Sequence, residues 1–447
     1  MASTLRSSRL RRLIAAYTIN RLGTWFGTVA VSLAVFDHTH SALAVAAVLI
    51  AGQVVPAFVV PALVARVEAS RRRRELSALY FFEAAATTAL AVLLWHFWLP
   101  GVLGLVALDG TAALAASALL RTAAARTARA ELKGDEAGAA GVDAGPDGKE
   151  HAAERATNAA LNVAFSGTFV LGPALGGAIV AAAGAPTALF IDAVTFLICG
   201  ALLVDLHPHV EEAAGESVRL RLRAAWSHIN AVPSLRALLL AQGLALVFFE
   251  SAAPIEVAYA KATLHAGDRG YGLLVAAWGM GAVLGSIVFA RSADQPLGRM
   301  VSAGTLAVGL AYVGFALSPS LPVACVAALF GGIGNGVQWA PLISAVQRLT
   351  PHHLQGRVMG ALESIGALTP AVGLSLGGAL VALSSARVAF LIVGLGAAAC
   401  TIVFARIPLG GGSEPAVVPA PSGHGGPSKE PDRVDALPAP VGESSPH

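Results

Sequence analysis

The chain has 447 residues, of which 55% are hydrophobic and only 13% are charged. Soluble domains carry charges on about 25% of their residues, so this composition excludes an ordinary soluble domain and indicates a membrane protein. The formal net charge of +3 is small. It gives no reason to expect a nucleic-acid partner.

Twelve blocks of apolar residues follow one another, each long enough for a helix to cross about 30 Å of hydrocarbon. They predict an all-α, multi-pass membrane protein in contact with the lipid bilayer. The first block follows the basic segment RSSRLRR, and because more spans follow at once we interpret it as a retained helix. The predicted spans are residues 13–36, 42–64, 76–97, 102–120, 159–182, 186–204, 237–259, 271–290, 300–316, 321–346, 358–383 and 388–404.

Charge placement predicts the topology, because Lys and Arg are retained on the cytoplasmic side during insertion. With the N-terminus inside, 26 of the 30 basic residues fall in cytoplasmic segments. The outer loops hold only Lys261, Arg269 and Arg387, and Arg21 lies within the first span. We therefore expect both termini in the cytoplasm.

The chain also repeats itself. The segment ALNVAFSGTFVLGPALGGAIVA of the fifth span aligns without gaps with ALESIGALTPAVGLSLGGALVA of the eleventh, 201 residues later. Repeated halves of this kind are typical of transporters, with a substrate site between them near the bilayer midplane. The repeat predicts two pseudo-symmetric six-helix halves, residues 1–205 and 236–407. A cytoplasmic loop, 206–235, joins them, and a disordered cytoplasmic tail, 408–447, follows. The polar segment 131–151 is expected to be mobile.

Several segments resemble the major facilitator superfamily, in particular bacterial drug and proton antiporters such as the macrolide efflux and siderophore export proteins. The segments are RLGTWFGTVAVSLAVF in the first span, ERATNAALN, GPALGGAIV and IDAVTFL around the fifth and sixth, and GIGNGVQWAPLISAVQRLTPHHLQGRVMG from the tenth onward. The resemblance covers residues 9–406. It implies the major facilitator fold of twelve transmembrane helices.

The resemblance also implies a function. We expect a monomeric secondary transporter in the bacterial cytoplasmic membrane that exports small amphipathic molecules or drugs, and so confers multidrug or antibiotic resistance, by proton antiport with alternating access. Two alternatives stay open: an importer or uniporter of a small metabolite, and a transporter-like membrane sensor that moves nothing. No enzymatic activity is expected, and the sequence indicates no cofactor and no metal site. Without a Walker lysine motif, ATP is not expected to drive transport.

Ionisable side chains inside spans are costly, which makes each one a candidate functional residue. Glu83 and Asp192 lie on spans that are peripheral in this superfamily, so we interpret them as structural. Arg21 and Asp109 lie on cavity-lining spans at similar depths, and we expect them to form an ion pair. Glu250, beside two phenylalanines in the seventh span, is the strongest proton-binding candidate. The proton-coupling candidates are therefore Glu250, Asp109 and Arg21.

In the superfamily the first, fourth, seventh and tenth spans line the central cavity, and the second, fifth, eighth and eleventh form the gates. The expected cavity residues are Asn20, Trp25, Phe26, Gln242, Phe249, Asn335 and Trp339. The expected gate residues are Glu363, its repeat partner Asn162, Glu68 and Arg357. Gly172, Gly176, Gly177, Gly377 and Gly378 are expected to permit close helix packing.

Overall fold

The computed structural model describes residues 8–69, 75–136, 146–204, 226–292 and 295–407. Within these ranges, twelve helices are long and apolar enough to cross a membrane. Each contains most of one apolar block found in the sequence, which confirms the all-helical, multi-pass prediction.

The helices follow one another with short connections. The first group is α1 (Ser8–Thr39), α2 (Ala42–Ala69), α3 (Glu75–Leu93), the 3₁₀ turn η2 (Leu94–His96), α4 (Leu99–Glu136), α5 (Pro146–Ala183) and α6 (Ala185–Leu203). The second group is α8 (Pro233–Ala258), the π-helical turn η3 (Tyr259–Thr263), α9 (Gly267–Arg291), α10 (Leu297–Leu317), α11 (Leu321–Arg348), α12 (His352–Leu383) and α13 (Ala386–Arg406).

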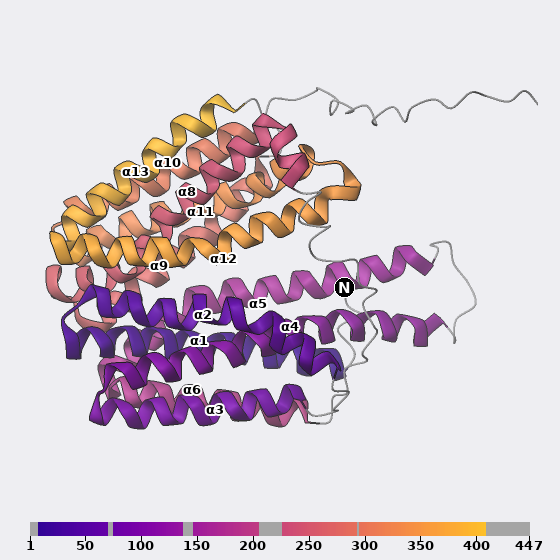
Figure 1. Cartoon of the computed structure of the whole chain (residues 1–447), viewed down its shortest axis with the longest axis horizontal. Helices are drawn as coiled ribbons and strands as arrows, with labels where there is room; N and C mark the ends of the chain where they lie inside the picture. Colours follow the sequence, from indigo (N-terminus) through magenta and orange to yellow (C-terminus); the bar gives the residue numbers. More distant parts are fainter. Residues whose placement is uncertain (1–7, 70–74, 137–145, 205–225, 293–294, 408–447) are drawn as a thin grey trace, which may run out of the picture. The chain divides into compact units, whose positions relative to one another are not determined.

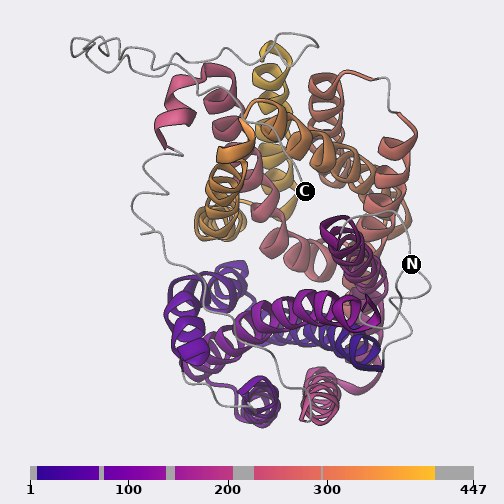
Figure 2. The ribbon, with the colours of Figure 1, turned by 90° about the vertical axis from the view of Figure 1, so that its right-hand side faces the viewer.

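Each group packs mainly within itself. In the first group, α1 packs against α5 and α6, and α3 packs against α4 and α6. In the second group, α10 packs against α11 and α13, and α8 packs against α12 and α13. The two groups meet chiefly where α5 contacts α9 and where α2 contacts α12, and Figures 1 and 2 both show α1–α6 on one side and α8–α13 on the other. This arrangement accords with the sequence repeat. The predicted boundaries between the halves stay a prediction, because residues 205–225 and 408–447 lie outside the described residues.

The predicted mobile segment 131–151 differs from the structure. Helix α4 continues to Glu136 and α5 begins at Pro146, so most of that segment is helical. The flanking sequences TAAARTARAEL and KEHAAERATNAA are rich in Ala, Glu, Lys and Arg, which have high helix propensity in spite of their low apolar content. The sequence analysis did not weigh this propensity; residues 137–145 lie outside those described, and the mobility of the segment stays a prediction.

Glycines set the distance between several helix pairs. A Cβ at Gly309 of α10 would lie 2.7 Å from the backbone nitrogen of Ala398 on α13 and 2.8 Å from the carbonyl oxygen of Gly394. Gly394 in turn faces the carbonyl oxygen of Gly309. Membrane helices associate through such close backbone contact because lipid provides no hydrophobic driving force between them.

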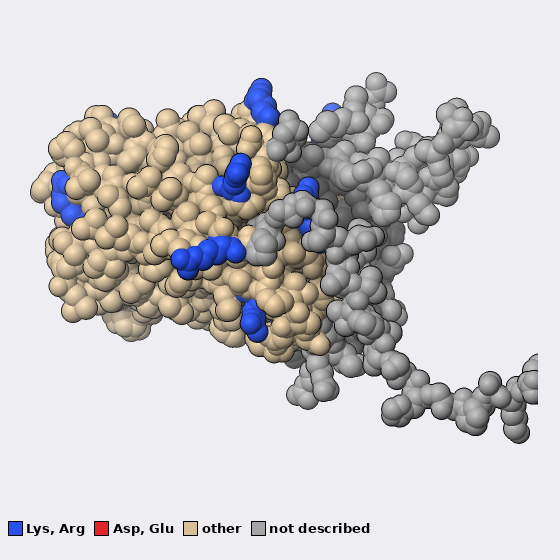
Figure 3. All heavy atoms as spheres, turned by 90° about the horizontal axis from the view of Figure 1, so that it is seen from above, with Lys and Arg blue, Asp and Glu red and all other residues tan. Residues whose placement is uncertain are grey.

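The surface agrees with a position in lipid. On the face drawn in Figure 3 a broad uncharged area separates a basic side chain at one end from several near the other, and no Asp or Glu is visible there. A surface of this kind can contact acyl chains without burying charge.

The glycine contact between α10 and α13 generates a stability prediction. Gly309→Ala should lower the free energy of unfolding by about 1 to 3 kcal/mol, because the added methyl group overpacks a backbone contact. Gly104→Ala is the matched control, since a Cβ there would meet nothing within 4 Å; it should be neutral or stabilising by up to about 1 kcal/mol through helix propensity. Thermal unfolding of the two purified variants in the same detergent measures both effects. Equal midpoints would contradict the packing role of Gly309.

Candidate functional site

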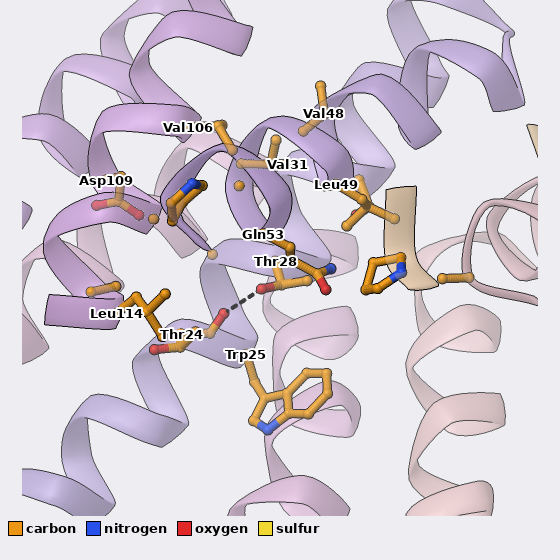
Figure 4. A pocket seen from close by; sticks show the side chains of 18 of the residues that line it. Thr24, Trp25, Thr28, Val31, Val48, Leu49, Gln53, Val106, Asp109 and Leu114 are labelled. Atoms are coloured by element: carbon orange, nitrogen blue, oxygen red, sulfur yellow. Dashed lines mark hydrogen bonds between the residues drawn. The ribbon is translucent and has the colours of Figure 1, made fainter. Parts of the chain in front are cut away.

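A cavity of about 670 Å³ lies between the two groups of helices. Its lining comes from α1 to α6 on one side and from α8, α9, α10 and α12 on the other. Figure 4 shows part of the α1–α4 side, where Thr24, Thr28 and Gln53 point into the same space as the apolar side chains of Val31 and Leu49. A cavity lined by both halves is where a transporter built from repeats binds its substrate.

Acidic side chains dominate the charge of the cavity. Asp109 and Asp192 line it from the first group, and Glu250 and Glu256 line it from the second. Among the described lining residues Arg21 is the one Lys or Arg. With these carboxylates ionised, the wall would attract cations, and such a low-dielectric concave site strengthens the attraction.

Asp109 and Arg21 have different neighbours. Thr87 of α3 donates a hydrogen bond from its hydroxyl to Asp109 Oδ1 at 2.9 Å. The guanidinium of Arg21 lies 4.8 Å from the centre of the Phe165 ring on α5, a cation–π distance. Among the described residues no Arg21–Asp109 ion pair is formed. The prediction of that pair is wrong for this conformation, because it used depth along the helices and left out the direction of each side chain.

Asp192 reaches the cavity from α6, a helix that the sequence analysis treated as peripheral. Its two carboxyl oxygens press against Gly23 and Gly27 of α1, where a Cβ would collide with them. The two glycines lie one helical turn apart, so they form a groove across α1 through which the carboxylate passes. The Thr195 hydroxyl donates at 2.7 Å to the backbone carbonyl oxygen of Asp192 and lies 3.4 Å from Asp192 Oδ1.

Aromatic rings form the wall opposite α1. Trp278 of α9 stacks on Tyr312 of α10 with ring centres 5.5 Å apart, and Phe249 of α8 lies 6.0 Å from Trp278. On the other side Trp25 and Phe169 meet edge to face at 5.2 Å. Rings that line a negative cavity suit flat, apolar groups and cationic groups alike.

The predicted cavity residues divide into two sets. Asn20, Trp25 and Phe249 line the cavity, as do all three proton-coupling candidates. Four others are not among the lining residues: Phe26, Gln242, Asn335 and Trp339.

The reasons for the second set are visible. Gln242 is 1% exposed and accepts a hydrogen bond from Gln338 Nε2 of α11 at 3.2 Å. Phe26 is buried at the α1–α5 contact, and Trp339 is 45% exposed. Phe26 and Gln242 lie on helices that line the cavity, but their side chains leave those helices in other directions. Asn335 and Trp339 lie on α11, which contributes no described lining residue.

Several residues that line the cavity were not among those predicted from the sequence. Glu256 lies seven residues after Phe249 on α8, which places it on the same face of the helix two turns later. Three further residues line the cavity from the second group of helices: Tyr271, Trp278 and Tyr312. The spacing of Glu256 from Phe249 was a usable signal. Trp278 and Tyr312 lie on gate and peripheral spans, where no signal in the sequence marked them.

The cavity is closed at one end by helix contacts. A Cβ at Gly177 of α5 would lie 2.7 Å from the Asp268 carbonyl oxygen and 2.9 Å from Gly272 Cα at the start of α9. Gly378 of α12 lies as closely against Ala46 and the Ala42 carbonyl oxygen of α2. The other expected packing glycines contact Trp25 and Val29 of α1 (Gly172 and Gly176) and the Ser251 carbonyl of α8 (Gly377). The predicted topology makes this the outer end.

The opposite end is loosely packed. On the same gate helices, Gly167 of α5 and Gly360 and Gly366 of α12 face open space. Glu363 is exposed one turn before Ala367, which lines the cavity from the same face of α12. Glu363 therefore lies toward the mouth at this end, which the predicted topology makes cytoplasmic. Of the other gate candidates, Arg357 is half-buried on α12. The side chains of Asn162 and Glu68 lie outside those described.

An ion-pair cluster lies at the closed end. Lys261 of η3 lies 2.5 Å from Asp37 Oδ1 at the end of α1 and 2.5 Å from Asp268 Oδ1 on α9. Lys261 and Asp268 belong to the second group of helices, and Asp37 belongs to the first. The Lys261–Asp37 contact therefore joins the two groups across the closed end and must break if they separate there.

Comparison with known proteins gives a consistent picture. The family model of the Major Facilitator Superfamily matches residues 238–431. An uncharacterized MFS-type transporter of Bacillus subtilis, YjbB, is 26% identical over 204 residues, which are 44% of this chain and 49% of YjbB. The multidrug efflux pump Tap of Mycobacterium tuberculosis is 27% identical over 252 residues, 54% of this chain and 58% of Tap. The chain thus spans about half the length of the curated relatives it matches.

The fold has solved counterparts. The crystal structure of the nucleoside transporter NupG superposes with a TM-score of 0.65 at 12% sequence identity, covering 89% of this chain and 98% of that one. At this identity the likeness concerns the arrangement of helices alone.

The cluster around Lys261 generates a prediction about closure. Asp37→Asn should shift the population toward a form open at this end about fivefold, the effect of removing roughly 1 kcal/mol of partly exposed ion pairing. The measurement is labelling of a cysteine at Ser32, a lining residue, by a membrane-impermeant thiol reagent applied to whole cells, with the three native cysteines replaced.

Asp268→Asn is the matched control. It also removes a carboxylate from Lys261, but it leaves the contact between the two groups intact. Faster labelling in Asp37→Asn and not in Asp268→Asn is the expected pattern, whereas equal labelling in both variants would show that the Asp37 contact does not hold this end closed.

Proposed function

We propose that this chain is a secondary active transporter of the major facilitator superfamily, whose family model matches residues 238–431, and that it exports small amphipathic molecules by proton antiport. Its place would be the bacterial cytoplasmic membrane, as a multi-pass protein. The efflux direction is supported by the similarity to Tap, which is named a multidrug efflux pump, and by the resemblance noted in the sequence.

The observation that carries the proposal is the cavity, closed at one end and loosely packed at the other. Both halves contribute to its lining, and the closed end depends on backbone contacts at Gly177 and Gly378 and on the Lys261–Asp37 ion pair. Alternating access requires such a site, with contacts that break at one end as they form at the other. In this reading Glu363, Asn162, Glu68 and Arg357 form the contacts of the opposite gate.

The chemistry of the wall supports a cationic, aromatic substrate. Asp109, Asp192, Glu250 and Glu256 outnumber Arg21 on the lining, and the stacked rings of Trp278 and Tyr312 offer faces to a flat or charged group. An ionised carboxylate in a membrane site needs a partner. A bound cation and a proton can each fill that role, which is the basis for exchanging one against the other.

Glu250 is the coupling residue in this proposal. It lies on α8 against Gly373 of α12, and within the described part of the chain no hydrogen bond or ion pair engages its carboxylate. Helix α12 is one of the helices whose packing closes the outer end. A proton on Glu250 would therefore change the charge of the cavity beside a helix that has to move.

The test is accumulation of ethidium, a flat organic cation, in cells that express the protein. Expression should lower the steady-state ethidium content, and a protonophore should restore it to that of cells without the protein. Lower accumulation that persists with a protonophore would indicate another energy source. Raised accumulation would indicate import, and no effect with any of a panel of organic cations would favour a sensor.

Glu250→Gln gives the residue-level prediction. Efflux should fall to about a tenth of wild type or less, because the variant keeps the shape of the side chain but cannot take up or release a proton. Transport into everted vesicles driven by an imposed pH gradient measures this directly. Glu430→Gln, which changes an acid outside the predicted membrane spans, is the control and should keep gradient-driven uptake. Retention of full gradient-driven uptake by Glu250→Gln would remove Glu250 from the coupling role.

A further inference from the structure

Glu83 of α3 is fully buried at 0% exposure. Both of its carboxyl oxygens lack a hydrogen-bond partner among the described residues. A carboxylate buried without a partner is so costly that the side chain takes up a proton instead. The sequence analysis interpreted Glu83 as structural, but a structural role would require a donor for its oxygens.

The surroundings of Glu83 are acidic. It interacts electrostatically with Asp109 of α4 and with Asp192 of α6, both of which line the cavity. Glu83 also lies one turn before Thr87, the residue that donates to Asp109. The three acids therefore run from the interior of the first group to the cavity wall.

Two neutral groups among the described residues also lie near Glu83. Tyr80 of α3 and Cys199 of α6 both interact with it electrostatically. The Tyr80 hydroxyl makes no hydrogen bond among the described residues, and the Cys199 thiol donates to the Ala16 carbonyl of α1. The described side chains that interact with Glu83 are thus acids and neutral groups.

A metal ion does not account for this cluster. Among the described residues no three His, Cys, Asp or Glu side chains lie close enough together to hold one. Three interacting carboxylates in a low-dielectric interior do not all ionise, and they bind protons as a coupled set. The ligand that fits the cluster is a proton.

We propose that Glu83 is a proton-binding site that Asp109 and Asp192 couple to the cavity, so that an organic cation bound between the two aspartates releases the proton from Glu83. The assignment to Glu83 follows from the donors: Thr87 donates to Asp109, which suits an ionised carboxylate, whereas no described donor reaches Glu83. The release follows from charge, because a cation beside the aspartates offsets their repulsion of an ionised Glu83. The exchange step rests on the proposed function; the proton site does not.

The first test needs no transport. Infrared spectra of the purified protein at neutral pH should contain the carbonyl stretch of a protonated carboxylic acid, and Glu83→Gln should remove it. Glu363→Gln, which changes an exposed acid, should leave it unchanged. A spectrum that is the same in wild type and Glu83→Gln overturns the proposal.

Asp192→Asn provides a variant that leaves Glu83 in place. Removal of the neighbouring negative charge makes ionisation of Glu83 easier, so the carboxylic acid band should disappear at a lower pH than in wild type. An unchanged or higher pH of disappearance would show that the two side chains are not coupled. This measurement keeps the proposal testable if Glu83→Gln does not fold.

The exchange is tested with tetraphenylphosphonium in weakly buffered solution containing a pH indicator dye. Wild type should release about one proton more per bound cation than Glu83→Gln, which keeps Glu250 and should still bind the cation. Equal release by the two proteins, or cation binding without release in wild type, contradicts the exchange step. A carboxylic acid band that depends on Glu83 in a protein without ethidium efflux would retain the site and reject the transport function.

Discussion

The close approach of α5 to α9 and of α2 to α12 determines the rest of this structure. Glycines at 177, 272 and 378 allow backbone to meet backbone at one end of the two halves, and in lipid such packing is a main source of attraction between helices. Where the same helices carry Gly167, Gly360 and Gly366, no described atom lies within 4 Å of where a Cβ would stand. The cavity is the space left between the tight and the loose end.

The charges of the cavity follow from this arrangement. Carboxylates are tolerated within a membrane protein when they face a cavity or a partner, and Asp109, Asp192, Glu250 and Glu256 all face this one. Glu83 is the exception, since it lies behind the wall with both oxygens unsatisfied among the described residues. The protonation of such a buried acid depends on the charge of its neighbours. A change of charge in the cavity is therefore expected to change the protonation of Glu83 in the interior of the first half.

Some residues expected at the site line the cavity and others point elsewhere, and their functional roles stay predictions. Depth along a helix follows from 1.5 Å per residue, and it placed Arg21, Asp109 and Glu250 at levels where the cavity lies. It could not show that Arg21 contacts Phe165 and Asp109 contacts Thr87. Helices that are apolar all round carry little amphipathic signal, so the sequence leaves their rotation about the axis undetermined. Gln242 was assigned to the cavity for the same reason, whereas Trp339 lies on α11, which contributes no described lining residue.

The sequence by itself determined the number and order of the membrane helices and the repeat of the fifth span in the eleventh, because a bilayer of fixed thickness demands apolar segments of fixed length. Only the tertiary structure decided which acids gather. Asp192 passes through the groove that Gly23 and Gly27 leave in α1 and interacts with Asp109, and Glu83 interacts with both from α3. Contacts between helices far apart in the chain depend on packing in three dimensions, and the sequence of one span does not specify which residues of other spans it will meet.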